Sequence, residues 1–301
     1  DFSANQSATF YLKLSNAGPI QAPLIIEHLG DFYARQMLFE AYYGILTGIF
    51  LLVLVINFFF WINLKDSTYF YYIIYTLGSM FALLYMSGHV MLYVLGGFPK
   101  LSGVAIISFL SLIVIGLPLF SKMFLNIKRK LLYYTLYTIA ICGLFILFYT
   151  LIIGYSTVFL LVALLLLSFS TLLVFVIGVI SLYLGKREAR FFVLAFGVYF
   201  IGMFVLILRL LGLIPISLFT NHVLEVASVI EIIIISLALS DRHNIERKKM
   251  EAKTLKLEME AQLNLELKVK ERTRELIHAN TRLREKDEIL SENIGALREV
   301  Q

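Results

Sequence analysis

Seven long apolar segments, separated by short polar loops, dominate the chain between residues 39 and 241. We predict membrane-spanning helices at residues 39–62, 69–87, 102–125, 131–153, 157–184, 190–213 and 219–241. Each segment is long enough to cross a hydrocarbon core of about 30 Å as a helix. The end of the second span stays open, because the apolar run at 91–98 either extends it or dips back into the interface. The pattern predicts an all-α membrane protein with a seven-helix bundle at residues 37–241.

The seventh segment continues into a charged stretch without a break. Between Pro215 and Gly295 the chain contains neither proline nor glycine, so nothing interrupts a single helix. At 1.5 Å per residue, a helix over residues 221–294 is about 110 Å long. The sequence therefore predicts a rod that passes from lipid into water.

Past Asp241 the apolar positions follow a heptad repeat. The predicted core positions are Leu276, Leu283, Leu290 and Leu297, alternating with Thr273, Asn280, Asp287 and Ile294. A polar residue such as Asn280 in a core position favours one register and one strand number at some cost in stability. The repeat predicts a parallel homodimeric coiled coil within residues 242–301, with a poorer register at residues 255–269.

Positive charges divide unevenly between the two sets of loops. The first, third and fifth loops hold eight of them: Lys65, Lys122, Lys128, Arg129, Lys130, Lys186, Arg187 and Arg190. The second, fourth and sixth loops hold Lys100 alone, and Arg242, Arg247, Lys248 and Lys249 follow the last span. Because cytoplasmic loops carry the excess of Lys and Arg, we predict an outside N-terminus and a cytoplasmic C-terminus.

Residues 1–36 are the only part of the chain with strand character. Two short β-rich runs, at residues 8–14 and 22–29, flank a turn signal at residues 16–19. Two strands are too few to be stable alone. We therefore interpret residues 1–36 as the end of an extracellular β domain whose earlier part precedes this sequence.

Composition agrees with a membrane protein, since 59% of the 301 residues are hydrophobic and the mean hydropathy is +0.84. The sequence pI of about 9.1 would suggest nucleic acid in a soluble chain. Here the cations lie beside apolar segments, where membrane lipid and topology explain them, so no nucleic-acid partner is expected. The only cysteine, Cys142, lies in an apolar run and supports neither a disulfide framework nor a thiolate metal site.

Aromatic residues cluster where the spans meet the predicted inner surface. FFFW at 58–61 ends the first span, YFYY at 69–72 begins the second, and YY at 133–134 begins the fourth. Amphipathic rings settle at membrane interfaces, so we interpret these clusters as anchors.

Four polar residues inside the spans are candidate functional positions: Asn57, Arg209, Glu225 and Glu231. Arg209 and Glu225 should both lie about 6 Å below the outer surface, where they could pair, and Glu231 lies near the midplane. Two interpretations remain open. The set senses or transmits a shift of the seventh helix, or it is a static clamp between helices. Asn57 could form a hydrogen bond across helices.

No catalytic motif, metal-ligand spacing or cofactor-binding loop is present in the sequence. His243 and His278 are interpreted as solvated positions of a helix. We therefore expect no catalytic site, no metal and no cofactor in these 301 residues.

Several short patterns occur in the order and spacing of a known family. YGIL at 43–46 and VIN at 55–57 precede KDSTYFYY at 65–72, and Glu231 stands five residues before SLALSDR at 236–242. Over residues 30–245 the chain resembles the bacterial seven-transmembrane receptors with diverse intracellular signalling modules. The order and spacing carry this likeness, because no single motif is diagnostic.

The resemblance implies a multi-pass protein of the bacterial inner membrane. It also implies an extracellular jelly-roll domain, often suspected of binding carbohydrate, of which residues 1–36 would be the end. A cytoplasmic output enzyme is expected after residue 301, such as the histidine kinase of a two-component system, a diguanylate cyclase, an adenylate cyclase or a phosphatase. KVKERTREL at 268–276 is similar to the linkers before such enzymes.

The features above bear on three possible functions. A receptor that passes an extracellular ligand signal through the seventh helix and a dimeric coiled coil agrees with every feature above. A small-molecule or ion transporter is the alternative, although the chain shows no internal repeat and the heptad tail would be an unusual appendage. A retinal photoreceptor is excluded, because residues 221–241 contain no lysine for a Schiff base.

Overall fold

A computed structural model describes residues 9, 11–13, 27–96, 98, 101–186, 188–210, 212–215 and 217–299. For residues 210, 218, 246, 288 and 290–299 it describes the backbone alone. The chain divides into two compact units, Asp1–Gly48 and Ile49–Gln301, and the boundary falls inside the first helix.

Seven helices in the described part of the chain are long and apolar enough to cross a membrane. They are α1 (Leu29–Leu64), α2 (Ser67–Met86), α3 (Ser102–Phe124), α4 (Lys130–Ile153), α5 (Thr157–Tyr183), α6 (Ala189–Leu210) and α7 (Leu218–Glu299). All seven predicted spans are therefore confirmed, most of them to within three residues at each end. For the described residues, this confirms the coarse fold class of an all-α protein with seven helices able to span a membrane.

The N-terminal boundary differs from the prediction. Helix α1 begins at Leu29, whereas the first span was predicted from residue 39, so residues 29–36 are helical where the sequence predicted the end of a β domain. Local contacts support this early start, because Arg35 forms an ion pair with Glu27 and Gln36 donates to Glu40 over 2.9 Å. The two β-rich runs at 8–14 and 22–29 lie largely outside the described residues; Thr9, residues 11–13 and residues 27–28 have no regular structure.

After α2 the chain turns before the next apolar run. Gly88 has a φ of +88°, a value that glycine tolerates and other residues rarely adopt. The π-helical turn η1 (Val90–Val94) follows as a separate element. Residues 91–96 therefore do not continue α2.

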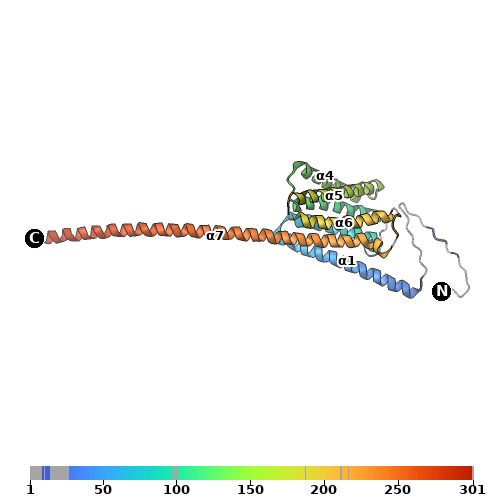
Figure 1. Ribbon diagram of the computed structural model, residues 1–301, viewed down its shortest axis with the longest axis horizontal. Helices are drawn as coiled ribbons and strands as arrows, with labels where there is room; N and C mark the ends of the chain where they lie inside the picture. The colour runs from blue at the N-terminus through green and yellow to red at the C-terminus, as the bar shows by residue number, and fades with distance from the viewer. Residues whose placement is uncertain are drawn as a thin grey trace. The chain divides into compact units, whose positions relative to one another are not determined.

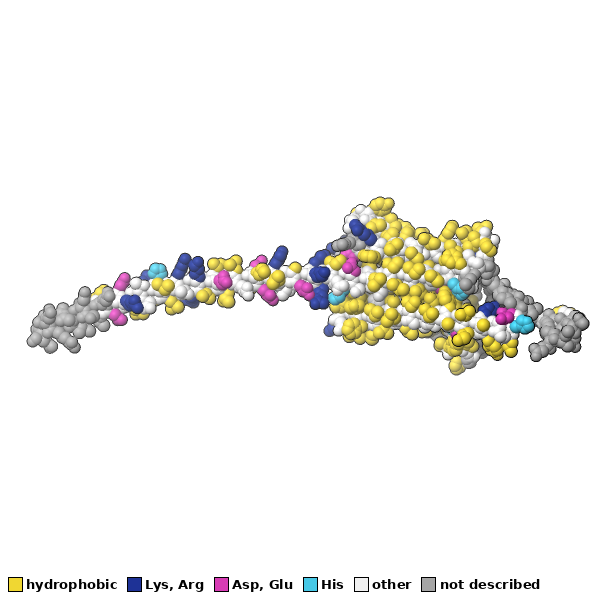
Figure 2. Space-filling view, turned by 60° about the horizontal axis from the view of Figure 1, so that its bottom comes forward, with side chains coloured by type: hydrophobic (Ala, Val, Ile, Leu, Met, Phe, Trp, Pro, Cys, Tyr) yellow, Lys and Arg dark blue, Asp and Glu magenta, His cyan; other side chains and the backbone are white. Residues whose placement is uncertain are grey.

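The bundle is built from neighbouring helix pairs (Figure 1). Helix α3 packs against α2, α4 and α5, while α6 packs against α5 and α7. The first part of α7 also contacts α2. The face of the bundle seen in Figure 2 is largely hydrophobic, as expected for a surface that faces lipid.

Aromatic rings connect α2, α3 and α6 inside the bundle. The ring of Tyr72 lies 5.1 Å from that of Phe120, and Phe124 stacks on Phe192 at 5.8 Å. All four side chains are buried. Rings of this size contribute large contact areas, so they hold the three helices in a defined arrangement.

Helices α2 and α3 are in close contact at Gly116. A Cβ atom added there would lie 2.5 Å from the backbone nitrogen of Tyr75, a contact that only a backbone shift could relieve. We expect Gly116→Ala to lower the free energy of unfolding by about 1–3 kcal/mol, measured by denaturant titration in detergent. Gly197→Ala on α6 is the matched control, because a Cβ there meets no described atom within 4 Å. Equal stability of the two variants would contradict this packing.

Helix α7 is one unbroken helix of 82 residues, or about 120 Å. This confirms the predicted continuity through Asp241. We call residues 242–299 of this helix the stalk. The side chains of residues 251–287, within the stalk, are all exposed. The end of the bundle where the stalk begins is named the stalk end, and the opposite end the far end.

At the stalk end, cations cap the carbonyl groups that end α3. Arg242 of α7 donates through Nη1 to the carbonyl oxygens of Met123 and Phe124 at 3.3 and 3.4 Å. Lys186 donates to the carbonyl oxygens of Leu125 and Asn126. Because the last carbonyls of a helix have no partners within it and carry partial negative charge, Arg242 fastens α7 to α3, and Lys186 fastens the α5–α6 loop to the same end of α3.

Candidate functional site

Three tyrosines on one face of α2 direct their hydroxyl groups at α7. Tyr69, Tyr72 and Tyr75 are spaced by three residues, a spacing that places side chains on the same face of a helix. The Tyr69 hydroxyl donates to the carbonyl oxygen of Leu239 over 3.2 Å. The Tyr72 hydroxyl donates to the carbonyl oxygen of Ile232 over 2.6 Å. The Tyr75 hydroxyl donates to Oε2 of Glu231 over 2.8 Å. All three rings are buried. We name this set the tyrosine seam.

Glu231 is the deepest polar group of the seam. Its side chain is 1% exposed, and its second oxygen, Oε1, has no hydrogen-bond partner among the described residues. Tyr199 of α6 also lies close enough to interact electrostatically with this carboxyl group. Placing a carboxyl group within the membrane costs free energy, so proteins that keep one there turn it toward the interior of the bundle. The carboxyl group of α7 therefore touches α2 directly and interacts with α6.

Helix α1 contributes one further polar contact to α7. Asn57, 1% exposed, donates through Nδ2 to Oγ of Ser236 over 3.0 Å and to the carbonyl oxygen of Val53 over 2.8 Å. The expected hydrogen bond of Asn57 across helices is thus present. Near the stalk end, the ring of Phe60 lies 6.1 Å from that of His243, so His243 is not simply a solvated position.

These contacts define the position of α7 along its own axis. A backbone carbonyl recurs at every turn of a helix, so Tyr69 and Tyr72 would find equivalent acceptors after a shift of about 5.4 Å. The carboxyl groups next to Glu231 along α7 are six residues before it, at Glu225, and ten after it, at Asp241, so no second carboxyl recurs one turn away. Ser240 follows Ser236 by one turn, so Asn57 would also find an equivalent acceptor after that shift. Any sliding or rotation of α7 must therefore break the bond of Tyr75 to Glu231 without replacing it.

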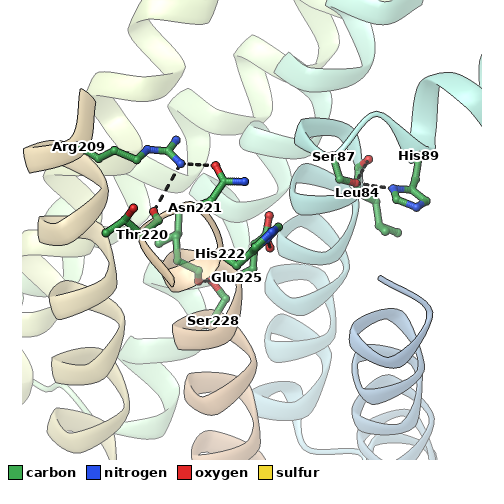
Figure 3. A network of polar contacts seen from close by, with 10 residues as sticks. Leu84, Ser87, His89, Arg209, Thr220, Asn221, His222, Glu225 and Ser228 are labelled. Atoms are coloured by element: carbon green, nitrogen blue, oxygen red, sulfur yellow. Dashed lines mark hydrogen bonds and ion pairs between the residues drawn. The ribbon is translucent and has the colours of Figure 1, made fainter. Parts of the chain in front are cut away.

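The far end holds the other two predicted candidates (Figure 3). Arg209 of α6 donates to Oδ1 of Asn221 and, over 3.5 Å, to the carbonyl oxygen of Thr220. Glu225 accepts from Nδ1 of His222 over 2.7 Å in a half-buried contact one turn apart on α7. Among the described ion pairs and hydrogen bonds, Arg209 and Glu225 therefore have different partners, and the direct pair considered from sequence is not formed.

The predicted core positions of the coiled coil lie along the stalk. Leu276 and Leu283 are 69% and 62% exposed, and Asn280 and Asp287 are exposed too. For Leu290, Ile294 and Leu297 the helical backbone alone is described. A single stalk helix therefore presents an apolar stripe that contacts nothing else in the described part of the chain.

The tyrosine seam was not recognised from the sequence. YFYY at 69–72 was interpreted as an interfacial anchor, yet Tyr69 and Tyr72 point inward and only Phe70 is exposed. The signal that could have revealed it is the spacing of 69, 72 and 75, which separates these rings from Phe70 and Tyr71. Their partners on α7 have no signature in the sequence.

The site has hydrogen-bond donors and acceptors but no obvious reaction centre. Across the described residues, no group of three or more His, Cys, Asp or Glu side chains is placed to hold a metal ion. The arrangement is suited to holding helices in a defined register.

Comparison with known proteins agrees with this description. The profile of a family described as 7TM diverse intracellular signalling matches residues 39–242, which is more than half of the chain. Among curated proteins and solved structures, none matches the chain. The matched region begins inside α1 and ends where the stalk begins.

Proposed function

This chain belongs to the 7TM diverse intracellular signalling family, and on that premise we propose that this signalling receptor conveys an extracellular ligand signal through α7 to a cytoplasmic output enzyme. The observation that carries the proposal is that one uninterrupted helix contains both the polar contacts of the bundle and the exposed stalk. A rigid helix transmits a displacement along its length, because its backbone hydrogen bonds resist bending.

In this proposal the far end faces outward and the stalk end faces the cytoplasm of a bacterium, in its inner membrane. The distribution of Lys and Arg supports that orientation. The ligand would act outside, and residues 1–36 would link its binding domain to the bundle. The family resemblance suggests carbohydrate as the ligand class.

The bundle would respond by moving α7 relative to α1 and α2. Glu231 selects one register of α7 through its bond with Tyr75, and Asn57 adds a bond to Ser236, so a ligand that favours another arrangement must compete with both bonds. A ligand shifts such an equilibrium only by its difference in affinity for the two states. A few buried hydrogen bonds, each contributing about 1 kcal/mol, are a barrier that ligand binding can overcome.

We further propose that the stalk forms a parallel homodimer through its heptad positions. The exposed leucines at 276 and 283 support this, because a second helix would bury them. Output domains such as histidine kinases or diguanylate cyclases would then follow as a pair, and a change in α7 would alter their relative placement.

The test changes how the stalk is rotated about its axis relative to the bundle. A diguanylate cyclase domain that is active only as a dimer is fused after Glu299, and residues are inserted between Lys249 and Met250. Seven helix-forming residues retain the heptad phase, and we expect cyclase output within about twofold of the parent. Two residues rotate the stalk by roughly 200° and should change output at least about fivefold. A Gly-Pro pair should uncouple output from any change in the bundle.

The insertions also show how the proposal could fail. If the two-residue, seven-residue and Gly-Pro variants all give the same output, the stalk does not transmit a helical movement. Membrane levels of each fusion, measured by immunoblot, serve as the control for folding.

A further inference from the structure

A groove lies at the stalk end, between the α1–α2 loop and α7. It has a volume of about 290 Å³. Its lining includes Tyr69 of the tyrosine seam, the charged or titratable residues Asp66, Arg242, His243 and Arg247, and apolar residues such as Leu64 and Leu239. Lys and Arg side chains gather around the point where the stalk leaves the hydrophobic bundle (Figure 2). The groove therefore combines cations with an apolar wall.

The charge of this groove is positive. Arg242 is held in place by its bonds to the end of α3, and Arg247 uses Nε for Glu251 over 2.8 Å. A guanidinium group has five N–H donors in a planar fork, so the contact of Arg247 through Nε leaves its Nη donors, which match a phosphate. Asp66 is occupied in capping α2, because its Oδ1 accepts from the backbone nitrogen of Thr68 over 2.8 Å.

The position of the groove indicates where its ligand comes from. Leu64 is the last residue of α1, and Arg242 follows the last apolar segment of the chain, so the groove lies at the level of a membrane surface. Phospholipid headgroups occupy this level, with acyl chains beside the apolar wall. A free phosphate would use the cations and leave the apolar wall without contact, whereas a lipid would use both.

We propose that this groove binds the headgroup phosphate of an anionic glycerophospholipid, with Arg247 as its hydrogen-bonding ligand and Arg242 adding positive charge. The bound lipid would bridge the α1–α2 loop and the first turn of the stalk. The groove adjoins the tyrosine seam, because Tyr69 also lines it, but lipid binding there does not depend on the proposed signal path.

The test uses the purified full chain in detergent and counts bound lipid by native mass spectrometry. Phosphatidylglycerol is titrated against phosphatidylcholine, which has the same phosphate but no net charge. We expect a saturable phosphatidylglycerol site, and Arg247→Gln should weaken it about tenfold, the scale of one or two charge-assisted hydrogen bonds. Arg247 is exposed, so this variant should remain folded, with an unchanged melting temperature.

Lys248→Gln is the matched control. It removes the same charge from the neighbouring residue of α7, which is not part of the groove lining, and should change the affinity by less than about twofold. An equal loss in Lys248→Gln would overturn the proposal in favour of general surface charge. Equal binding of phosphatidylcholine would also overturn it. Displacement of phosphatidylglycerol by millimolar inorganic phosphate would assign the groove to a free phosphate compound instead.

Discussion

Glu231→Leu is expected to lower the free energy of unfolding of the bundle by about 1–3 kcal/mol. The substitution removes the acceptor of Tyr75, so a buried hydroxyl group loses its partner inside the membrane region. Glu231→Gln retains an oxygen that accepts from Tyr75, and its cost should stay below about 1 kcal/mol. Unfolding of the purified protein by denaturant in mixed micelles measures both values.

A double-mutant cycle separates the bond from other effects of the substitution. Tyr75→Phe combined with Glu231→Leu removes both partners, and the double variant should be about 1 kcal/mol more stable than the sum of the single effects predicts. Tyr71→Phe provides the control, because it removes the same hydroxyl from the same helix at a position with no described bond to α7. Strict additivity of Tyr75→Phe and Glu231→Leu would show that the two groups do not interact.

The same variants bear on the proposed function. In the cyclase fusion, Glu231→Leu and Tyr75→Phe remove the group that selects one register of α7, so both should shift basal output in the same direction. A static clamp predicts lower protein levels without a change of output per molecule. The two interpretations left open by the sequence are thereby distinguished.

Leu283→Cys is expected to yield mostly covalent dimers when membranes are oxidised, at least about fivefold more than an outward-facing position. In a parallel coiled coil, residue 283 of one helix faces residue 283 of the other across the core. The background carries Cys142→Ala, which removes the only native thiol. Non-reducing electrophoresis measures the fraction of dimer, and Leu276→Cys should behave in the same way.

Glu285→Cys is the control for this experiment. Residue 285 lies two positions after 283, on the side of the helix opposite the predicted core, and its side chain is exposed to a similar degree in a single helix. Comparable cross-linking at 283 and 285 would indicate random collision. Absence of dimers at 276 and 283 alike would remove the coiled-coil proposal, while the membrane bundle would be unaffected.

Helix lengths and boundaries could be predicted because they depend on local chemistry. Apolar segments of sufficient length fixed six of the seven spans closely, and the absence of Pro and Gly after Pro215 predicted the unbroken α7. The start of α1 was missed by contrast, since residues 29–38 are polar enough to resemble a loop although they form helical contacts such as Gln36–Glu40.

The candidate site was predicted only in part. Burial of Glu231 and the bond of Asn57 across helices followed from the rule that polar groups inside a membrane face the bundle interior. The partners of Arg209 and Glu225 did not follow from their similar depth. Depth fixes a position along the membrane normal, whereas pairing also depends on the rotation of each helix about its axis.

The amino-acid sequence by itself determined that this protein crosses a membrane on seven helices and continues from the last one as an uninterrupted rod, because hydrophobic length and helix breakers act within one segment. Only the tertiary structure decided that Tyr69, Tyr72 and Tyr75 bond to α7, since the partner of a hydroxyl group is set by how two distant helices are rotated and packed. Gly116 shows the reason, because it is the closeness of α2 and α3 there that positions Tyr75.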